Sequence, residues 1–290
     1  MKIEAYIKHL SGQVNSFIRK VVSFGNKKVD SAVAYAVFSG GKRLRPALFL
    51  VTLESLGKKI NQDALRVAAA LEFVHVFSLI QDDLPLMDND DYRRGRPTAH
   101  KVFGEDIALL ASDALLNRAY ALICRDSAFS AELKSKILSE LAVAVNNLIA
   151  GQADDLDLVR KKKIPAGRLN DIYMAKTGAL LSACVKIAGI IKGLNAAELK
   201  KLGSFGNKLG LVYQISDDLL NVSCDKKTFK GRLLSDKKRG KLTYLSMFGR
   251  DKALDISDGL INGAIREIKN IPMDKGRLLE LCFFILKRKY

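Results

Sequence analysis

The spacing of helix-breaking residues limits most strongly how this chain can fold. Prolines occur at only five of 290 positions (46, 85, 97, 165 and 272), so two stretches of more than sixty residues contain none. A proline inside a helix removes a backbone hydrogen bond and clashes with the preceding turn. Neither an alternating run long enough for a sheet nor a repeat of fixed period occurs. The sequence therefore predicts an all-α fold, in one large domain or two small ones.

The most unusual segment of the chain is acidic. Five carboxylates lie within ten residues, at positions 82, 83, 88, 90 and 91. They repel one another, so a folded protein that gathers them places cations nearby. A hard divalent metal bound through oxygen is the first candidate. A solvated loop is the usual interpretation of an isolated acidic run, but here a buried helix precedes it and the pair Arg93 and Arg94 follows it.

The helix expected before this segment is apolar almost all round, from Val67 to Ile80, which is typical of a helix buried in a large protein. Only Glu72, His75 and Ser78 interrupt it. At helical spacing, His75 and Ser78 share one face with Asp82. This pattern predicts a pocket with a hydrocarbon floor and a rim that binds metal and phosphate.

A second acidic pair lies on another expected helix. Four polar residues follow the i, i+3, i+4, i+7 rule and share a face: Gln214, Asp217, Asp218 and Asn221. Two acidic faces of this kind could hold metals between them. Taken alone, a solvent-facing pair of aspartates explains this segment equally well.

A basic loop lies near the N-terminus, in the segment Ser39–Pro46. Its glycines let backbone amides approach an anion, while Lys42 and Arg45 supply charge and hydrogen-bond donors to a diphosphate. The alternative is a simple turn before a helix that starts near Pro46.

Together these segments resemble the trans-isoprenyl diphosphate synthases, a family that includes farnesyl and geranylgeranyl diphosphate synthases. The first acidic motif with its arginine pair carries the resemblance most specifically: Asp82, Asp83, Asp88, Arg93 and Arg94. The likeness extends from Gly40 to the basic C-terminus. It implies the isoprenoid synthase fold, a single domain over residues 1–290 with its helices around a central cavity. It also implies a homodimer that condenses isopentenyl diphosphate with an allylic diphosphate, using magnesium or, alternatively, manganese.

The resemblance implies roles for individual residues. Isopentenyl diphosphate would be bound by Lys42, Arg45, His75 and Arg94. Metal would be bound by Asp82, Asp83, Asp88, Asp217 and Asp218. The allylic diphosphate would be held by Arg93, Lys176 and Lys241, with Thr177 and Gln214 beside it. The residues expected to act directly in catalysis are Asp82, Asp83, Lys176 and Asp217. Gln152 and Asp155 match a family pair that lines the metal site.

The segment Lys176–Ala179 interrupts an apolar stretch in a way typical of a functional kink in a helix. A lysine there would reach a phosphate from a mostly hydrocarbon wall. A surface lysine beside a C-cap glycine is the competing interpretation.

Three positions depart from the family pattern. Asn221 stands where an aspartate is usual, Cys224 replaces a glycine, and the usual Gly-Lys of the next loop reads Lys230-Gly231. An asparagine lacks the carboxylate charge, so metal affinity on this side is expected to fall. A catalytically weakened partner subunit of an active synthase is therefore one alternative.

Product length is expected to depend on residues just over one helical turn before Asp82, namely Phe77 and Ser78. The resemblance to the bacterial type, with the inserted pair Leu86–Met87 and an aromatic residue five places before Asp82, implies a C15 product, farnesyl diphosphate. A geranylgeranyl diphosphate synthase is the alternative. Phe77 could equally be ordinary core packing.

Two further classes compete with this interpretation. Terpene cyclases share the helical fold and an acidic motif, but they need no second diphosphate site of the kind that Lys42 and Arg45 suggest. The net charge of +17 would fit a nucleic-acid-binding protein. The basic residues are spread out without interleaved aromatic residues, so we expect no nucleic-acid partner.

The remaining features point to a cytoplasmic protein without stable membrane insertion. The N-terminus lacks a hydrophobic signal core, and the apolar segment 178–191 is interrupted by Lys186 and is expected to be too short to span a bilayer. Four cysteines, at positions 124, 184, 224 and 282, show no paired spacing, so neither a zinc site nor a disulfide framework is expected.

Overall fold

A computed structural model describes residues 1–125, 128–158, 165–223 and 242–286. In chain order the helices of the first half are α1 (Ile3–Val21), α2 (Lys27–Val37), α3 (Leu44–Ser55), α4 (Gln62–Asp83), α5 (Ala99–Phe103), α6 (Glu105–Arg125) and α7 (Ala131–Leu158). Those of the second half are α8 (Ala166–Tyr173), the π-helix η1 (Met174–Gly178), α9 (Ala179–Lys192), α10 (Ala196–Ser223), α12 (Tyr244–Phe248), α13 (Arg250–Glu267) and α14 (Gly276–Leu286). Two-residue strands β1 (Tyr92–Arg93) and β2 (Arg96–Pro97) form the one sheet of the described residues. The all-α prediction is confirmed.

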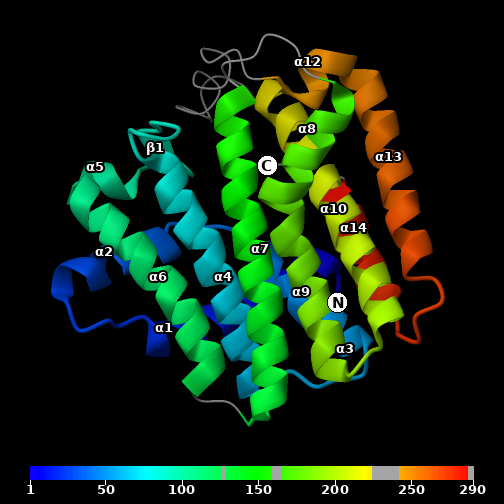
Figure 1. Ribbon diagram of the computed structural model, residues 1–290, viewed down its shortest axis with the longest axis horizontal. Helices are drawn as coiled ribbons and strands as arrows, with labels where there is room; N and C mark the ends of the chain where they lie inside the picture. The colour runs from blue at the N-terminus through cyan, green and yellow to red at the C-terminus, as the bar shows by residue number, and fades with distance from the viewer. Residues whose placement is uncertain (126–127, 159–164, 224–241, 287–290) are drawn as a thin grey trace.

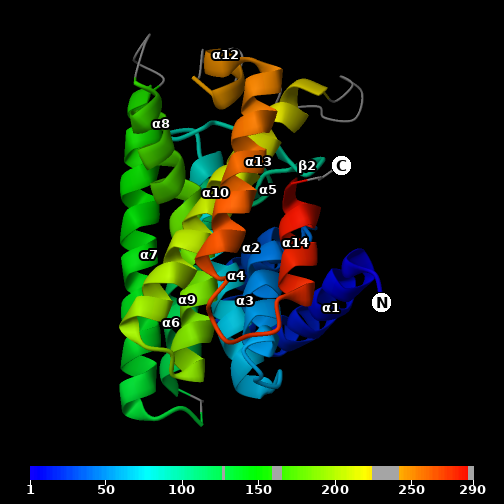
Figure 2. The ribbon, with the colours of Figure 1, turned by 90° about the vertical axis from the view of Figure 1, so that its right-hand side faces the viewer.

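In the view of Figure 1 the long helices form a bundle, with α4, α7, α9 and α10 between α6 on one side and α13 on the other. Helix α4 packs against α6 and α3, and α9 packs against α3, α7 and α10. Helix α13 covers the outer side of α10. Turned by a quarter, the molecule has α7 along one edge and α1 and α14 along the other (Figure 2). The β1–β2 hairpin and α12 lie toward the same end of the bundle in both views, which places the ends of α4 and α10 on one side.

Helix α4 has the buried character that its sequence predicts. Fifteen of its residues are buried, and they lie on all sides of the helix. Its first turn is capped by Asn61, whose side chain accepts a hydrogen bond from the Ala64 amide. Its last turn carries Asp82 and Asp83, which are buried as well. The first acidic pair is therefore fixed by a helix that packing holds on every side.

Two glycines bring the central helices unusually close together. A Cβ atom on Gly151 of α7 would lie 2.4 Å from the backbone nitrogen of Lys176, and one on Gly210 of α10 would lie 2.4 Å from the Cα atom of Gly178. Real Cβ contacts are not this short. Only glycine at these positions lets α7 and α10 pack directly on the backbone of η1.

The core consists of one large apolar cluster and a smaller one. The smaller cluster lies where α7, α8, α10, α12 and α13 meet and includes Leu158, Ile172, Tyr173, Ile215 and Tyr244. Leu260 packs against both clusters. The single domain expected over residues 1–290 stays a prediction.

Two helical segments, Glu105–Arg125 and Gly167–Lys192, are long and apolar enough to cross a membrane. The expectation that the apolar segment 178–191 is too short to span a bilayer was wrong, because the π-helix joins α8 to α9. The continuous helical run is Gly167–Lys192 and has 26 residues. In the first segment 39% of the apolar stretch is buried inside the protein, and in the second segment 67% is buried. Burial in the core accounts for most of the second segment.

Candidate active site

The loop after α4 folds back on the helix end. The Asp88 amide donates a hydrogen bond to the Asp82 carbonyl at 2.8 Å, and the Met87 and Asn89 amides donate to the Leu84 carbonyl at 2.9 and 3.0 Å. The inserted residue Leu86 is 90% exposed. The loop thus accommodates the two-residue insertion as an outward bulge, which brings the Asp88 backbone next to that of Asp82.

A short hairpin returns the arginine pair to this helix end. At its tip, Arg94 and Gly95 both have positive φ angles, 53° and 76°, as a two-residue type I′ turn requires. The Arg93 Nε atom donates to both carboxylate oxygens of Asp83, at 2.8 and 2.7 Å. Asp83 and Arg93, expected to bind metal and diphosphate respectively, therefore bind each other in this structure.

Lys176 lies among carboxylates contributed by two other elements. Its Nζ atom donates to Asp155 Oδ2 at 2.6 Å, and Asp155 is 3% exposed. Burial alone would lower the pKa of Lys176, but Asp82, Asp155 and Asp88 outweigh burial and raise the pKa well above its ordinary value. The charges of Asp82 and Asp88 thus act on the same ammonium group that pairs with Asp155.

A π-helix presents this lysine. The π-helix overlaps the kink expected at Lys176–Ala179, but the helix is widened rather than broken, since η1 continues directly into α9. Such π-turns occur frequently at functional sites. Next to Lys176, the Thr177 hydroxyl donates to Gln214 Oε1 of α10 at 3.1 Å. Adjacent residues of η1 thereby reach α7 on one side and α10 on the other.

The second acidic pair is held in different ways by its surroundings. Asp218 is 6% exposed, and its carboxylate accepts hydrogen bonds from Tyr173 Oη at 3.0 Å and from Gln214 Nε2 at 3.2 Å. Asp217 is half-buried. Asp218 therefore accepts two hydrogen bonds from the protein, and Asp217 is the more accessible carboxylate of the pair.

These oxygen donors suit a hard divalent cation, although they do not yet surround one point. Among the residues that the structure describes, no three histidine, cysteine, aspartate or glutamate side chains converge as a metal site. Both polar atoms of the Gln152 amide are buried and lack a hydrogen-bond partner within this part of the chain. The Lys176 ammonium pairs with Asp155. The donor set fits a metal such as magnesium by its chemistry.

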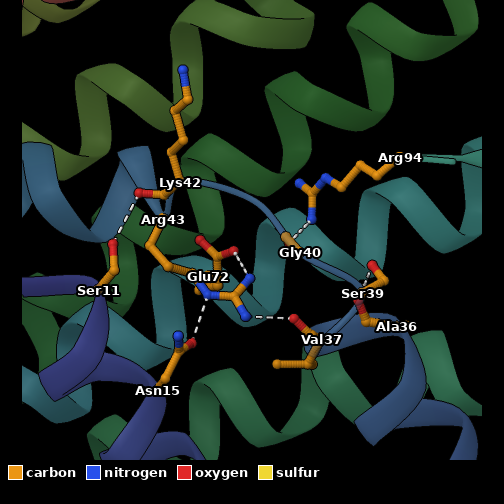
Figure 3. Close-up of polar contacts among 10 residues, drawn as sticks. All are labelled: Ser11, Asn15, Ala36, Val37, Ser39, Gly40, Lys42, Arg43, Glu72 and Arg94. Carbon is orange, nitrogen blue, oxygen red and sulfur yellow. Dashed lines mark hydrogen bonds and ion pairs between the residues drawn. The ribbon is translucent and has the colours of Figure 1, made fainter. Parts of the chain in front are cut away.

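The basic loop forms a separate part of the site. Gly40 and Gly41 have φ angles of 105° and 116°, and Arg94 donates a hydrogen bond to the Gly40 carbonyl (Figure 3). The Lys42 ammonium lies 5.2 Å from the centre of the Phe284 ring, and the Arg45 guanidinium lies 5.8 Å from that of Tyr213. The Nε atom of Arg45 is buried without a hydrogen-bond partner in the described structure. Arg94 thus links the basic loop to the acidic motif.

His75 lies under this cluster of cations. Desolvation lowers its pKa well below the ordinary value of 6.5, and Arg45, Arg94, Arg93 and Arg43 lower the pKa further. The influence of Arg45 and Arg94 on the pKa of His75 is consistent with the expectation that these three residues lie close together. His75 is neutral at physiological pH.

The low pKa of His75 predicts a loss of stability in acid. Below pH 6.5 the unfolded chain binds a proton that the folded chain refuses, so folding stability falls by about 1.4 kcal/mol per pH unit until the folded-state pKa is reached. The melting temperature should therefore drop less between pH 7.5 and 5.5 for His75→Gln than for the wild type. Equal drops in both proteins would contradict this assignment.

Several expected site residues lie outside what the structure describes. Lys241, Cys224 and the pair Lys230-Gly231 fall in residues 224–241, and the side chain of Asn221 is likewise not described. Of the two residues expected to limit product length, Phe77 is buried in the large core cluster. The Ser78 hydroxyl donates to the His75 carbonyl at 2.9 Å.

An all-α bundle with an acidic segment at the end of one buried helix, a second acidic pair on another and a basic loop beside them defines a class of proteins with the isoprenoid synthase fold. The family model for polyprenyl synthetase matches residues 26–271. The chain belongs to the polyprenyl synthetase family.

Named relatives agree with this placement. The farnesyl diphosphate synthase of Geobacillus stearothermophilus is 37% identical over 92% of this chain and 90% of its own. The geranylgeranyl diphosphate synthase of Cyanophora paradoxa is 35% identical over 95% and 93%. The crystal structure of geranylgeranyl pyrophosphate synthetase from Pyrococcus horikoshii superposes with a TM-score of 0.86 at 29% identity, over 99% of this chain and 98% of its own. Relatives named for a C15 product and relatives named for a C20 product are thus similar to this chain to nearly the same degree.

Sequence reasoning assigned no role to two residues that shape this site, Arg43 and Tyr173. The Tyr173 hydroxyl binds Asp218, and Arg43 forms a buried ion pair with Glu72 at 2.8 Å. A signal for the ion pair exists in the sequence. Glu72 is a carboxylate on an otherwise apolar helix, and a buried charge needs a partner.

Proposed function

We propose that this chain joins isopentenyl diphosphate to dimethylallyl or geranyl diphosphate, head to tail, and that its product is farnesyl diphosphate. One observation carries the proposal. Lys176 pairs with the buried carboxylate Asp155, and the charges of Asp82 and Asp88 also act on it, while the basic loop is bound to Arg94 through the Gly40 carbonyl. Two anion sites of different composition match a reaction with two diphosphate substrates, only one of which must lose its diphosphate.

The acidic side would promote departure of the allylic diphosphate. Polyprenyl synthetases generally depend on divalent metals. A metal held by Asp82, Asp83, Asp88, Asp217 and Asp218, magnesium in our proposal with manganese as the alternative, would act as a Lewis acid on the departing oxygens. Lys176, with Arg93 and Lys241, would stabilise the same charge in a preorganised site. Both roles proposed for Asp83 and Arg93 require their mutual contact to open when ligands enter.

The basic side would hold the nucleophile. Lys42, Arg45, His75 and Arg94 would bind isopentenyl diphosphate, whose double bond attacks the allylic carbocation. The apolar core residues of α4 would exclude water, which would otherwise quench that cation. The proton lost from the condensed chain would pass to the released diphosphate, so no protein base is needed.

The direct test is incubation of purified protein with isopentenyl diphosphate and either dimethylallyl or geranyl diphosphate, with magnesium and with a chelator. A magnesium-dependent C15 product supports the proposal. A C20 product keeps the chemistry and replaces the product with geranylgeranyl diphosphate. The absence of product from either starter would favour a weakened partner subunit and count against the proposed activity.

Phe77→Ala should lengthen the product. We propose that its ring, buried close to the acidic end of α4, limits the space below Asp82. Removing the ring opens room for further isoprene units, so C20 or longer chains should appear beside C15. The readout is chromatography of the prenyl alcohols after phosphatase treatment. Phe73→Ala, one helical turn earlier and also fully buried, controls for general loosening of the core. An unchanged C15 product would refute the role of Phe77.

We further propose a homodimer, formed through the outer faces of α6 and α7. Large apolar side chains are half or nearly half exposed there: Leu109, Leu110, Val143 and Ile149. A second copy of the chain would remove this apolar area from water. Sedimentation of the purified protein measures the oligomeric state, and a monomer would reject the proposal.

A further inference from the structure

The basic loop contains a third cation, Arg43, whose side chain extends in a different direction from that of Lys42 (Figure 3). Its guanidinium is 4% exposed and donates to three different elements: to Asn15 Oδ1 of α1 at 2.9 Å, to the Val37 carbonyl at the end of α2 at 2.5 Å, and to Glu72 Oε1 of α4 at 2.8 Å. Figure 3 shows the Lys42 side chain extending away from this group of contacts. Arg43 is therefore bound to three elements of the protein interior, while the Lys42 side chain extends in another direction.

The backbone at Arg43 is unusual for a residue with a side chain. Arg43 has φ 50° and ψ 43°, in the left-handed region, which disfavours L-residues other than glycine. This conformation turns the chain immediately before α3, between Lys42 and Arg45. The three hydrogen bonds of the guanidinium keep the residue there.

Glu72 is the only carboxylate that the structure pairs with Arg43 in its described residues, and it lies deep in α4. Glu72 is 2% exposed. Its second oxygen, Oε2, is buried without a hydrogen-bond partner in the described part of the chain. Desolvation lowers the pKa of Arg94, and Glu72 is the strongest influence that opposes this lowering. Glu72 thus pairs with Arg43, and its charge also favours the protonated form of Arg94.

The rest of the loop is held from two further sides. The Ser11 hydroxyl of α1 donates to the Lys42 carbonyl at 3.0 Å, and Arg94 donates to the Gly40 carbonyl. A Cβ atom on Gly41 would lie 2.7 Å from Arg94 Nη1. The backbone is therefore held at Gly40, Lys42 and Arg43, and this leaves little freedom in where Lys42 and Arg45 begin.

We propose that Arg43 and Glu72 are a positioning pair, which fixes the Ser39–Pro46 loop so that Lys42 and Arg45 meet the diphosphate of the non-ionising substrate. The inference rests on the proposed function, since it assumes that this substrate is isopentenyl diphosphate. A buried ion pair is poor evidence for a purely stabilising role, because apolar residues of similar volume often stabilise a fold equally well. The pair instead fixes conformation.

Three variants separate positioning from charge. Arg43→Met removes the guanidinium and one positive charge. Glu72→Gln removes a negative charge, so the loop becomes more positive while the ion pair is lost. The double variant Arg43→Met/Glu72→Leu leaves the net charge unchanged and replaces both groups by apolar side chains. If only the local potential mattered, Glu72→Gln would bind a diphosphate more tightly than the wild type.

The measurements are the KM values for isopentenyl and geranyl diphosphate, the dissociation constant for isopentenyl diphosphate by calorimetry, and the melting temperature. We expect each variant to raise the KM and the dissociation constant for isopentenyl diphosphate about tenfold or more and to change the KM for geranyl diphosphate less than twofold. Where a single variant fails to fold, the double variant decides, because its melting temperature should return toward the wild-type value while the KM stays raised.

Other results would overturn the proposal. Wild-type binding of isopentenyl diphosphate by a well-folded double variant would show that the pair is structural only. Tighter binding by Glu72→Gln would show that only charge matters. Arg66→Met serves as the control, because Arg66 pairs with Asp63 at the other end of α4 and should leave both KM values unchanged. If the wild type made no prenyl product, the proposed function would fail, whereas the dissociation constants would still test the pair.

Discussion

Asp82→Ala should lower turnover by at least about a hundredfold to a thousandfold while the protein remains folded, the size of effect seen when one preorganised group that stabilises transition-state charge is removed. Asp82 lies in the last turn of the buried helix α4, and its charge is the largest single influence that raises the pKa of Lys176. It is the group on which the proposed metal site most depends. Steady-state product formation at saturating magnesium and substrates measures the loss, and circular dichroism checks the fold.

Asp91→Ala is the matched control for this experiment. Asp91 belongs to the same acidic run, but its side chain is 56% exposed and pairs with Lys101 at the surface at 2.8 Å. A surface pair of this kind contributes little, so turnover should stay within about twofold of the wild type. Near-normal activity of Asp82→Ala, or an equal loss in both variants, would sink the assignment of Asp82.

Lys176→Met is expected to have the second large effect, and it acts on both turnover and stability. The substitution leaves Asp155 buried without its ammonium partner, and breaking a buried pair in this way costs about 3–5 kcal/mol. Turnover should fall about a hundredfold or more, because Lys176 would no longer stabilise the departing diphosphate. Without the competing ammonium, magnesium alone should raise the melting temperature of the variant more than that of the wild type.

The rise in melting temperature with magnesium distinguishes a role of Lys176 at the metal site from a merely structural role. Lys186→Met removes a similar ion pair between the same two parts of the bundle, with Glu140 of α7, away from the acidic motifs. It should lose stability without gaining a larger response to magnesium. A response of Lys176→Met no greater than that of Lys186→Met would contradict the placement of Lys176 at the metal site.

Local patterns in the sequence were sufficient to predict the main elements. The all-α class is found, and the buried helix expected before Asp82 corresponds to α4. Apolar periodicity reports burial directly, so these predictions needed no tertiary information. The β1–β2 hairpin was not foreseen, because two-residue strands are too short to show an alternating pattern.

The site was predictable as a set of residues but not as a set of contacts. Asp83 and Arg93 are ten positions apart, and their mutual pairing depends on the hairpin that turns at Arg94 and Gly95. The contact of Lys176 with Asp155 depends on how closely α7 approaches η1. Gly151 of α7 permits this close approach. Such relations between distant segments leave no periodic signal in either segment.

The π-helix has a consequence for how tolerant this site is of changes in chain length. A π-turn holds one residue more than an α-turn, and each residue of an α-helix turns the chain by about 100°. Deleting one residue of Met174–Gly178 would restore an ordinary helix, but it would rotate α8 against α9 by that angle. Either Lys176 would leave Asp155, or Gly178 would leave its contact with Gly210. The length of this segment is therefore as much a part of the site as the identity of its residues.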